Sequence, residues 1–244
     1  MPESSIVAAI VFLAVFTQSL TGFGSALVAM AILPAVIALN TATPLVALVM
    51  VTIEVVLLVK YRKSVNIKAV LALVLGSLPG IPLGLFLTTR VDETVVLTTL
   101  GFVVSGYALY SLIADRRGGI RRLRIRNPSL AYPFGFVAGV LGGAYNITGP
   151  PVVVYADCSD WPAEEFKGNL QGFFVVTSLA IVIGHAWKGN IGSVVGHYYA
   201  VSLPAMALGI VAGTSADQIL KPVVFRKVVL ALLVVMGLRL IVSA

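Results

Sequence analysis

Two short runs of glycine, hydroxyl and amide residues interrupt long apolar stretches of this chain of 244 residues. The first run, TGFGS, covers residues 21–25, and the second, GGAYNITGPP, covers residues 142–151. Glycine and proline interrupt helices. A helix that begins again after an interruption presents N–H groups and its positive dipole end to an anion. The two runs therefore predict two sites at which main-chain amides bind a small anion.

Side chains within and beside the two runs are the expected ligands. Hydroxyl and amide groups donate hydrogen bonds, glycine lets the main chain approach the anion, and proline fits the first turn of a helix. On these grounds, the substrate-binding residues of the first run are Gln18, Thr21, Gly22, Phe23, Gly24 and Ser25. Those of the second run are Asn146, Ile147, Thr148, Gly149 and Pro150, joined by Gln171 near the start of a later apolar stretch.

Some of these residue types have a second use in membrane helices. Glycine allows helices to pack closely, and Gly135, Gly139 and Gly143 are spaced four residues apart, as on a helix-packing face. Asn169 and Gln171 suit an anion site, but they also suit a helix cap and contact with a neighbouring helix. Both interpretations stay open at the level of the sequence.

The composition places the chain in a membrane. Hydrophobic residues make up 59% of the chain and charged residues 11%, whereas soluble domains carry about 25% charged residues. The mean hydropathy is +1.02. Lipid must therefore act as the solvent, and we expect an all-α polytopic membrane protein.

Few residues remain for other chemistry. One cysteine and two histidines exclude an internal disulfide framework and predict no metal site, and we expect no cofactor. The chain has no Walker run, no His-Glu-x-x-His motif and no paired carboxylates in its apolar stretches, so we expect no enzymatic activity. Because the chain has no ATP-binding motif, any transport of an anion would have to be driven by ion or substrate gradients. The net charge of +7 is concentrated in two short loops, which argues against nucleic acid as a partner.

Six apolar runs have the length of about 20 residues that a membrane-spanning helix needs. They lie near residues 42–59, 69–88, 94–113, 168–187, 193–213 and 222–242. Two longer runs, 5–39 and 130–157, contain the interruptions. The sequence therefore predicts about eight membrane segments, two of them broken.

The two interruptions lie in the same register of a duplicated sequence. Counting from Gly24 to Gly149 gives an offset of 125 residues, and the SLP of residues 77–79 recurs at this offset in residues 202–204. Internal duplication is frequent in transporters. We expect two homologous four-segment repeats, each opening with a broken helix, at residues 1–114 and 129–244, joined by a basic linker at residues 115–128.

The behaviour of the broken segments decides the topology. If each one crosses the membrane the repeats are parallel, and if each one returns as a re-entrant hairpin the repeats are inverted. Hairpins place more of the 17 Lys and Arg residues on the cytoplasmic side, which favours hairpins by a small margin. Both arrangements put the basic loops 60–68 and 115–126 in the cytoplasm.

Glu54 lies within an apolar run, where a carboxylate is costly unless it is paired or faces water. It is the candidate for binding a coupling proton, since burial favours the protonated form. The alternative is a carboxylate near the helix end that pairs with Lys60 or Arg62 or reaches the interface. Sodium is the other coupling ion that we consider.

The TGFG run, the second run at 142–151 and the duplicated plan resemble the TauE/SafE sulfite exporter family, also called TSUP, over nearly the whole chain. The resemblance implies a multi-pass permease of the bacterial inner (plasma) membrane for sulfur-containing oxyanions such as sulfite, sulfonates or thiosulfate. We expect an exporter that binds the anion at the paired breaks and works by alternating access, as a monomer or an oligomer. The alternatives are a membrane scaffold or subunit of a larger complex, and a passive anion channel.

Overall fold

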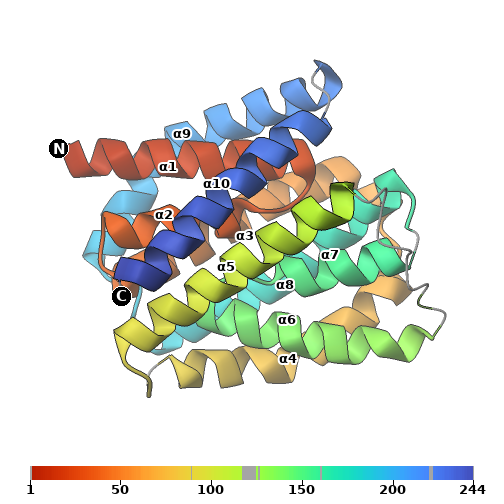
Figure 1. Ribbon diagram of the computed structural model, residues 1–244, viewed down its shortest axis with the longest axis horizontal. Helices are drawn as coiled ribbons and strands as arrows, with labels where there is room; N and C mark the ends of the chain where they lie inside the picture. Colours follow the sequence, from red (N-terminus) through yellow and green to blue (C-terminus); the bar gives the residue numbers. More distant parts are fainter. Residues whose placement is uncertain are drawn as a thin grey trace. The chain divides into compact units, whose positions relative to one another are not determined.

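The computed structural model describes residues 2–88, 90–116, 125, 127–159, 161–219 and 222–243, and every regular element within these ranges is a helix (Figure 1). The α-helices are α1 (Pro2–Thr21), α2 (Ser25–Ile32), α3 (Leu39–Tyr61), α4 (Ile67–Leu87), α5 (Glu93–Arg116), α6 (Ala131–Tyr145), α7 (Gly149–Cys158), α8 (Ala163–Trp187), α9 (Ser193–Ile219) and α10 (Pro222–Ser243). Three short 3-10 helices are η1 (Leu33–Ala35), η2 (Arg62–Ser64) and η3 (Pro128–Leu130).

Six helices of the described chain are long and apolar enough to cross a membrane, namely α1, α3, α4, α5, α8 and α9. The 21 residues of α4, at a rise of 1.5 Å each, measure about 30 Å, which matches the hydrocarbon core of a bilayer. Large apolar side chains such as Leu71, Leu75 and Phe102 remain exposed on these helices, as lipid-facing residues do. The prediction of an all-α polytopic membrane protein is confirmed.

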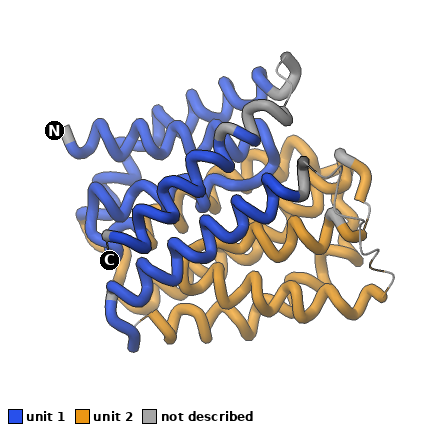
Figure 2. The backbone as a smooth tube through the Cα atoms, in the orientation of Figure 1, with its two compact units in different colours: residues 1–42, 90–121, 194–244 blue, residues 43–89, 122–193 orange. Residues whose placement is uncertain are grey.

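The helices form two compact units (Figure 2). Unit 1 contains residues 1–42, 90–121 and 194–244, and unit 2 contains residues 43–89 and 122–193. Each unit therefore takes helices from both halves of the sequence that were predicted to be repeats. Most of the predicted basic linker, including residues 117–124, lies outside the described residues.

Glycine main chain forms the contact between α4 and α6 in unit 2. A Cβ atom added at Gly139 would lie 2.2 Å from the carbonyl oxygen of Ser77, and the corresponding distances from Gly135 and Gly143 to α4 carbonyl oxygens are 2.2 and 2.1 Å. These values are far below van der Waals contact, so only glycine permits this approach of the helices. The packing interpretation of Gly135, Gly139 and Gly143 is confirmed.

Helix α8 runs parallel to α4. Near the start of both helices, the N–H of Asn66 donates to Oδ1 of Asn169 over 2.6 Å. At their far ends, Nζ of Lys188 donates to the carbonyl oxygen of Leu85 over 2.6 Å. Successive glycines of α6 meet successive turns of α4 in the same order, so α4, α6 and α8 all run in one direction. The chain must return between α6 and α8, and α7 is the helix that lies there.

Unit 1 contains a matching pair of parallel helices, α1 and α9. Near their starts, the Tyr198 hydroxyl donates to a carboxylate oxygen of Glu3 over 2.7 Å. Farther along, a Cβ atom added at Gly213 would lie 2.6 Å from the carbonyl oxygen of Phe16. Helix α5 packs along α10, and α2 packs against α1, α5 and α10.

One contact recurs in both units at the offset of the predicted duplication. In unit 2, a Cβ atom added at Gly84 would lie 2.2 Å from the carbonyl oxygen of Val140. In unit 1, a Cβ atom added at Gly209 would lie 3.0 Å from the side chain of Val15. Gly209 follows Gly84 by 125 residues, and Val140 follows Val15 by the same number. Corresponding helices thus meet at corresponding residues, which supports a duplication.

We predict that Gly139→Ala destabilises the protein by about 1–3 kcal/mol, because the new Cβ forces α4 and α6 apart. The measurement is the unfolding temperature of the purified protein in detergent. Gly106→Ala is the matched control, since no atom lies within 4 Å of a Cβ added there, and alanine favours the helix. Equal unfolding temperatures for the two variants would contradict the packing argument.

Candidate functional site

Helix α1 ends at Thr21 and α2 begins at Ser25, and the residues between them reverse the chain. Gly22 and Gly24 have φ angles of 90° and 102°, in the left-handed region that glycine adopts without strain. Helix α2 folds back along α1 and packs against it (Figure 1). We call α1, this turn and α2 the first hairpin.

Polar side chains hold the turn of the first hairpin together. The Thr21 hydroxyl lies within hydrogen-bond distance of the carbonyl oxygens of Thr17, at 2.8 Å, and Phe23, at 2.7 Å. The Ser25 hydroxyl donates to Oε1 of Gln18, and both side chains are buried. These side chains therefore support the main chain of the turn.

The start of α2 presents uncapped amides. The first N–H groups of a helix have no partner within that helix, and no side chain caps α2 at Gly24. Ser25, Ala26 and Leu27 are buried, so bulk water has little access to their amides. The positive end of α2 is therefore suited to an anion.

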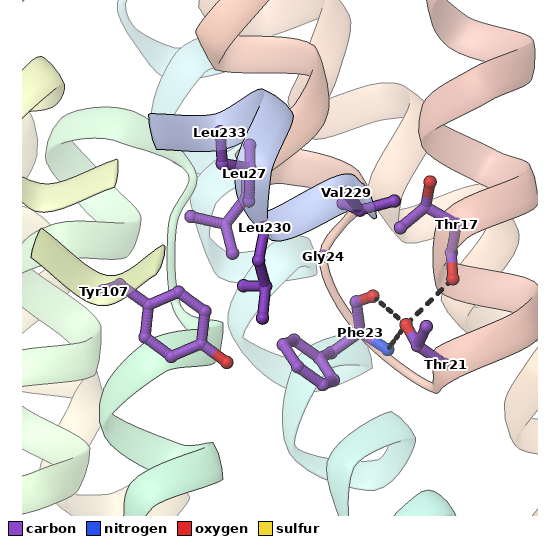
Figure 3. A pocket seen from close by; sticks show the side chains of 9 residues that line it. All are labelled: Thr17, Thr21, Phe23, Gly24, Leu27, Tyr107, Val229, Leu230 and Leu233. Atoms are coloured by element: carbon purple, nitrogen blue, oxygen red, sulfur yellow. Dashed lines mark hydrogen bonds between the residues drawn. The ribbon is translucent and has the colours of Figure 1, made fainter. Parts of the chain in front are cut away.

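A pocket in unit 1 lies beside this helix end (Figure 3). The Phe23 ring meets the Tyr107 ring edge-on, with 6.3 Å between the ring centroids. The side of the pocket that α10 supplies is apolar. The surface that lines the pocket is almost entirely apolar, and the Thr17 and Thr21 hydroxyls bond to main-chain carbonyl oxygens, so the pocket is a hydrophobic space beside the turn. It is lined by Thr17, Thr21, Phe23, Gly24, Leu27, Tyr107, Val229, Leu230 and Leu233.

Helices α6 and α7 of unit 2 also form a hairpin, which we call the second hairpin. The rings of Phe134 and Tyr155 lie 5.6 Å apart, and the N–H of Ile125 donates to the carbonyl oxygen of Cys158 over 2.9 Å. These contacts join the start of α6 to the end of α7. The 15 residues of α6 and the 10 of α7 measure about 22 and 15 Å, less than a membrane-spanning helix needs.

The turn of the second hairpin is tied to α6 and to the start of α3. Asn146 has a φ of 60°, a left-handed conformation that asparagine tolerates better than most residues. The N–H of Asn146 donates to the carbonyl oxygen of Gly142 over 2.8 Å, and the N–H of Ile147 donates to the carbonyl oxygen of Leu141 over 3.3 Å. Nδ2 of Asn146 donates to the carbonyl oxygen of Thr43 over 2.9 Å. The turn therefore has a defined shape.

Two side-chain oxygens of this turn, Oδ1 of Asn146 and Oγ1 of Thr148, have no hydrogen-bond partner within the described chain. Each residue exposes only 1% of its surface. The first turn of α7 adds few donors, because Pro150 and Pro151 have no N–H. The two hairpins therefore differ in chemistry, since the second has fewer main-chain donors at its helix start and carries two buried side-chain oxygens without a partner in the described chain.

The remaining predicted site residues lie in unit 2. Gln171 of α8 and Glu54 of α3 are both fully buried. Oδ1 of Asn169 accepts the N–H of Asn66, and its Nδ2 donates to Oε1 of Glu165 over 3.3 Å. The helix-contact interpretation is confirmed for Asn169.

The pocket contains residues that the sequence did not single out. Tyr107 carries a weak signal, because a hydroxyl-bearing ring stands in the middle of an apolar run. Thr17 lies one turn before the interruption and carries a similar signal. Val229, Leu230 and Leu233 carry none, since their types are those of any lipid-facing or core position.

We predict that Ser25→Ala lowers the free energy of unfolding by about 1–3 kcal/mol, because the buried Oε1 of Gln18 loses this donor. Ser202→Ala is the matched control in unit 1, since the buried Ser202 hydroxyl has no hydrogen-bond partner within the described chain. Thermal unfolding in detergent is the measurement. If Ser25→Ala proves as stable as Ser202→Ala, the Gln18 contact does not hold the turn.

Comparison with known proteins agrees with this architecture. Residues 7–240 match the family described as sulfite exporter TauE/SafE. The chain is similar to a protein of Cupriavidus necator named "Probable sulfite/organosulfonate exporter TauE", with 21% identity over 231 residues, which cover 94% of this chain and 90% of that protein. No solved structure matches the chain. The chain belongs to the TauE/SafE sulfite exporter family, whose members are membrane transporters and not enzymes.

Proposed function

We propose that this protein exports a sulfur-containing oxyanion across the bacterial inner membrane and binds it at the first hairpin. The observation that carries the proposal is the uncapped, buried amide end of α2 beside a pocket. A sulfite or sulfonate group is an oxygen acceptor with negative charge, and such groups bind helix N-termini. The name of the relative from Cupriavidus necator supports this substrate class.

The apolar wall of the pocket favours a substrate with a carbon chain. Val229, Leu230 and Leu233 form one side of the pocket, and Thr21 and Gly24 of the turn line it beside the start of α2. An organosulfonate has this division, with a charged head and an apolar chain. Sulfite has only the head, so it would use the amides at the start of α2 and leave the apolar pocket empty.

We further propose that both hairpins are re-entrant and that the two repeats are inverted. In unit 2, α4 and α6 each begin after a basic loop and run in the same direction. Because basic loops stay in the cytoplasm, both helices would run outward from it. Helix α7 returns to the end of the hairpin at which Ile125 lies, and α8 then runs outward too. This arrangement gives each repeat three crossings, with alternating access through the paired breaks.

Glu54 is the proposed proton site. It is fully buried in α3, at a depth where an ionisable side chain is costly and commonly functional. Protonation would remove the charge and the cost of burying it. A proton gradient can then drive the anion without ATP.

The substrate is tested by flux from proteoliposomes loaded with sulfite, thiosulfate, or alkyl sulfonates of one to four carbons. We expect saturable flux of sulfonates, with affinity rising about threefold or more per added carbon as long as the chain contacts the apolar wall, since each buried CH₂ contributes about 0.8 kcal/mol. Flux without saturation or counterflow would indicate a channel. No flux of any of these anions would indicate a scaffold or subunit and overturn the proposal.

The site is tested by Gly24→Ala, with Gly189→Ala as the matched control. Both glycines have a positive φ, of 102° and 71°, and a Cβ added at either meets no crowding. Each substitution should therefore cost about 1–2 kcal/mol of stability through backbone strain. Only Gly24→Ala should lower anion flux, by tenfold or more, because it shifts the amides of α2. Equal flux in the two variants would place the anion elsewhere.

A further inference from the structure

The oxygen acceptors of the second hairpin have a fixed direction. Nδ2 of Asn146 donates to the carbonyl oxygen of Thr43 over 2.9 Å. If the amide were flipped, Oδ1 would face that carbonyl oxygen, and two hydrogen-bond acceptors would repel each other. The hydrogen bond therefore fixes the orientation of the amide. Oδ1 of Asn146 therefore points away from Thr43, and it accepts no hydrogen bond from the described chain.

The end of α6 adds main-chain acceptors to this turn. The last carbonyl groups of a helix have no partner within it, and they form the negative end of its dipole. The amides of Asn146 and Ile147 donate hydrogen bonds to the carbonyl oxygens of Gly142 and Leu141. No main-chain amide of the described chain donates to the carbonyl oxygens of Gly143 and Ala144. The hairpin thus leaves side-chain and main-chain oxygens in one buried turn.

These groups do not suit an anion. Of the side chains in the turn, Asn146 has already used its donor group, and the Oγ1–H of Thr148 is a single donor. Pro150 and Pro151 remove two amides from the start of α7. An anion here would meet the Gly149 amide at the start of α7, but it would also face Oδ1 of Asn146 and the carbonyl oxygens at the end of α6, which repel it. A buried acceptor without a donor costs free energy, and a cation would remove that cost.

The ligands are neutral oxygens, which points to a monovalent ion. Calcium and magnesium sites in proteins normally include carboxylates, and the turn contains none. The described chain has no cluster of three His, Cys, Asp or Glu that would hold a transition metal. Carbonyl oxygens at a helix C-terminal end are the type of ligand that holds Na⁺ in broken membrane helices.

We propose that the turn of the second hairpin binds Na⁺ through Oδ1 of Asn146 and Oγ1 of Thr148, with the carbonyl oxygens of Gly143 and Ala144 completing the ligands. The use of this ion to drive anion export rests on the proposed function. Binding of the ion does not, and the test below measures binding alone.

The test compares the unfolding temperature of the purified protein in NaCl, KCl and choline chloride at equal ionic strength. Na⁺ should raise the unfolding temperature above the value in choline in a saturable way, because a ligand that binds only the folded state stabilises it, and K⁺ should raise it less. Thr148→Val keeps the shape of the side chain and removes the oxygen. It should weaken the apparent Na⁺ affinity by about tenfold or more, which corresponds to about 1.4 kcal/mol.

A second variant and a control make the assignment specific. Asn146→Gly keeps the left-handed turn and removes Oδ1, so it should weaken Na⁺ binding as Thr148→Val does. Ser178→Ala is the control in unit 2, since the buried Ser178 hydroxyl also lacks a hydrogen-bond partner within the described chain. It should leave the Na⁺ affinity unchanged.

Four results would overturn the site. Equal unfolding temperatures in the three salts would mean that water fills the turn. An Na⁺ effect that survives in both Thr148→Val and Asn146→Gly would place the ion elsewhere, and so would an equal loss in Ser178→Ala. If both turn variants fail to fold, the measurement is ²²Na⁺ binding to the wild-type protein. No detectable binding would then overturn the site. Na⁺ binding in a protein that moves no sulfur-containing anion would support the site and contradict the proposed function.

Discussion

Main-chain amide and carbonyl groups inside a membrane must have hydrogen-bond partners, and this constraint governs the whole structure. Helices satisfy it for most of the chain. At the turns of residues 22–24 and 146–148 the helices end, so the main chain needs other partners there, and hydrogen bonds within each hairpin supply some of them. Such turns persist only inside protein or beside water. The structure supplies protein around them, since the residues of both turns are buried or nearly so.

Close helix packing positions each hairpin within its unit. The first helix of each hairpin, α1 or α6, lies parallel to a helix of the other sequence half, α9 or α4, and the contact relies on glycine main chain. A small residue at such a contact brings the helix axes together and leaves little freedom to slide. Each hairpin therefore belongs to a compact unit that contains helices from both halves of the sequence.

The sequence predicted the helical class and the positions of the interruptions, because apolar length and glycine spacing are properties of the chain itself. The six predicted single spans each overlap a helix of the structure. It could not predict that α4 lies against α6 or that Leu230 of α10 lines a pocket with Gly24, since apolar residues carry no signal of their partners. It also treated the two runs as alike, because Thr21 and Asn146 are both polar. The two runs differ in which of their donors and acceptors are already hydrogen-bonded within the protein, and only the structure shows that.

That difference follows from the residues that stand at matching positions of the two halves of the sequence. At the offset of 125 residues, Ser25 and Ala26 correspond to Pro150 and Pro151, so two amides of the first hairpin have no counterpart in the second. Phe23 corresponds to Thr148, so a ring that meets Tyr107 is replaced by a hydroxyl without a protein partner. The first hairpin thus has amides at the start of α2 that the start of α7 lacks, and the second has buried side-chain oxygens without a partner in the described chain. Such a difference would suit the two hairpins to ligands of opposite charge, the anion and the Na⁺ that we propose for them.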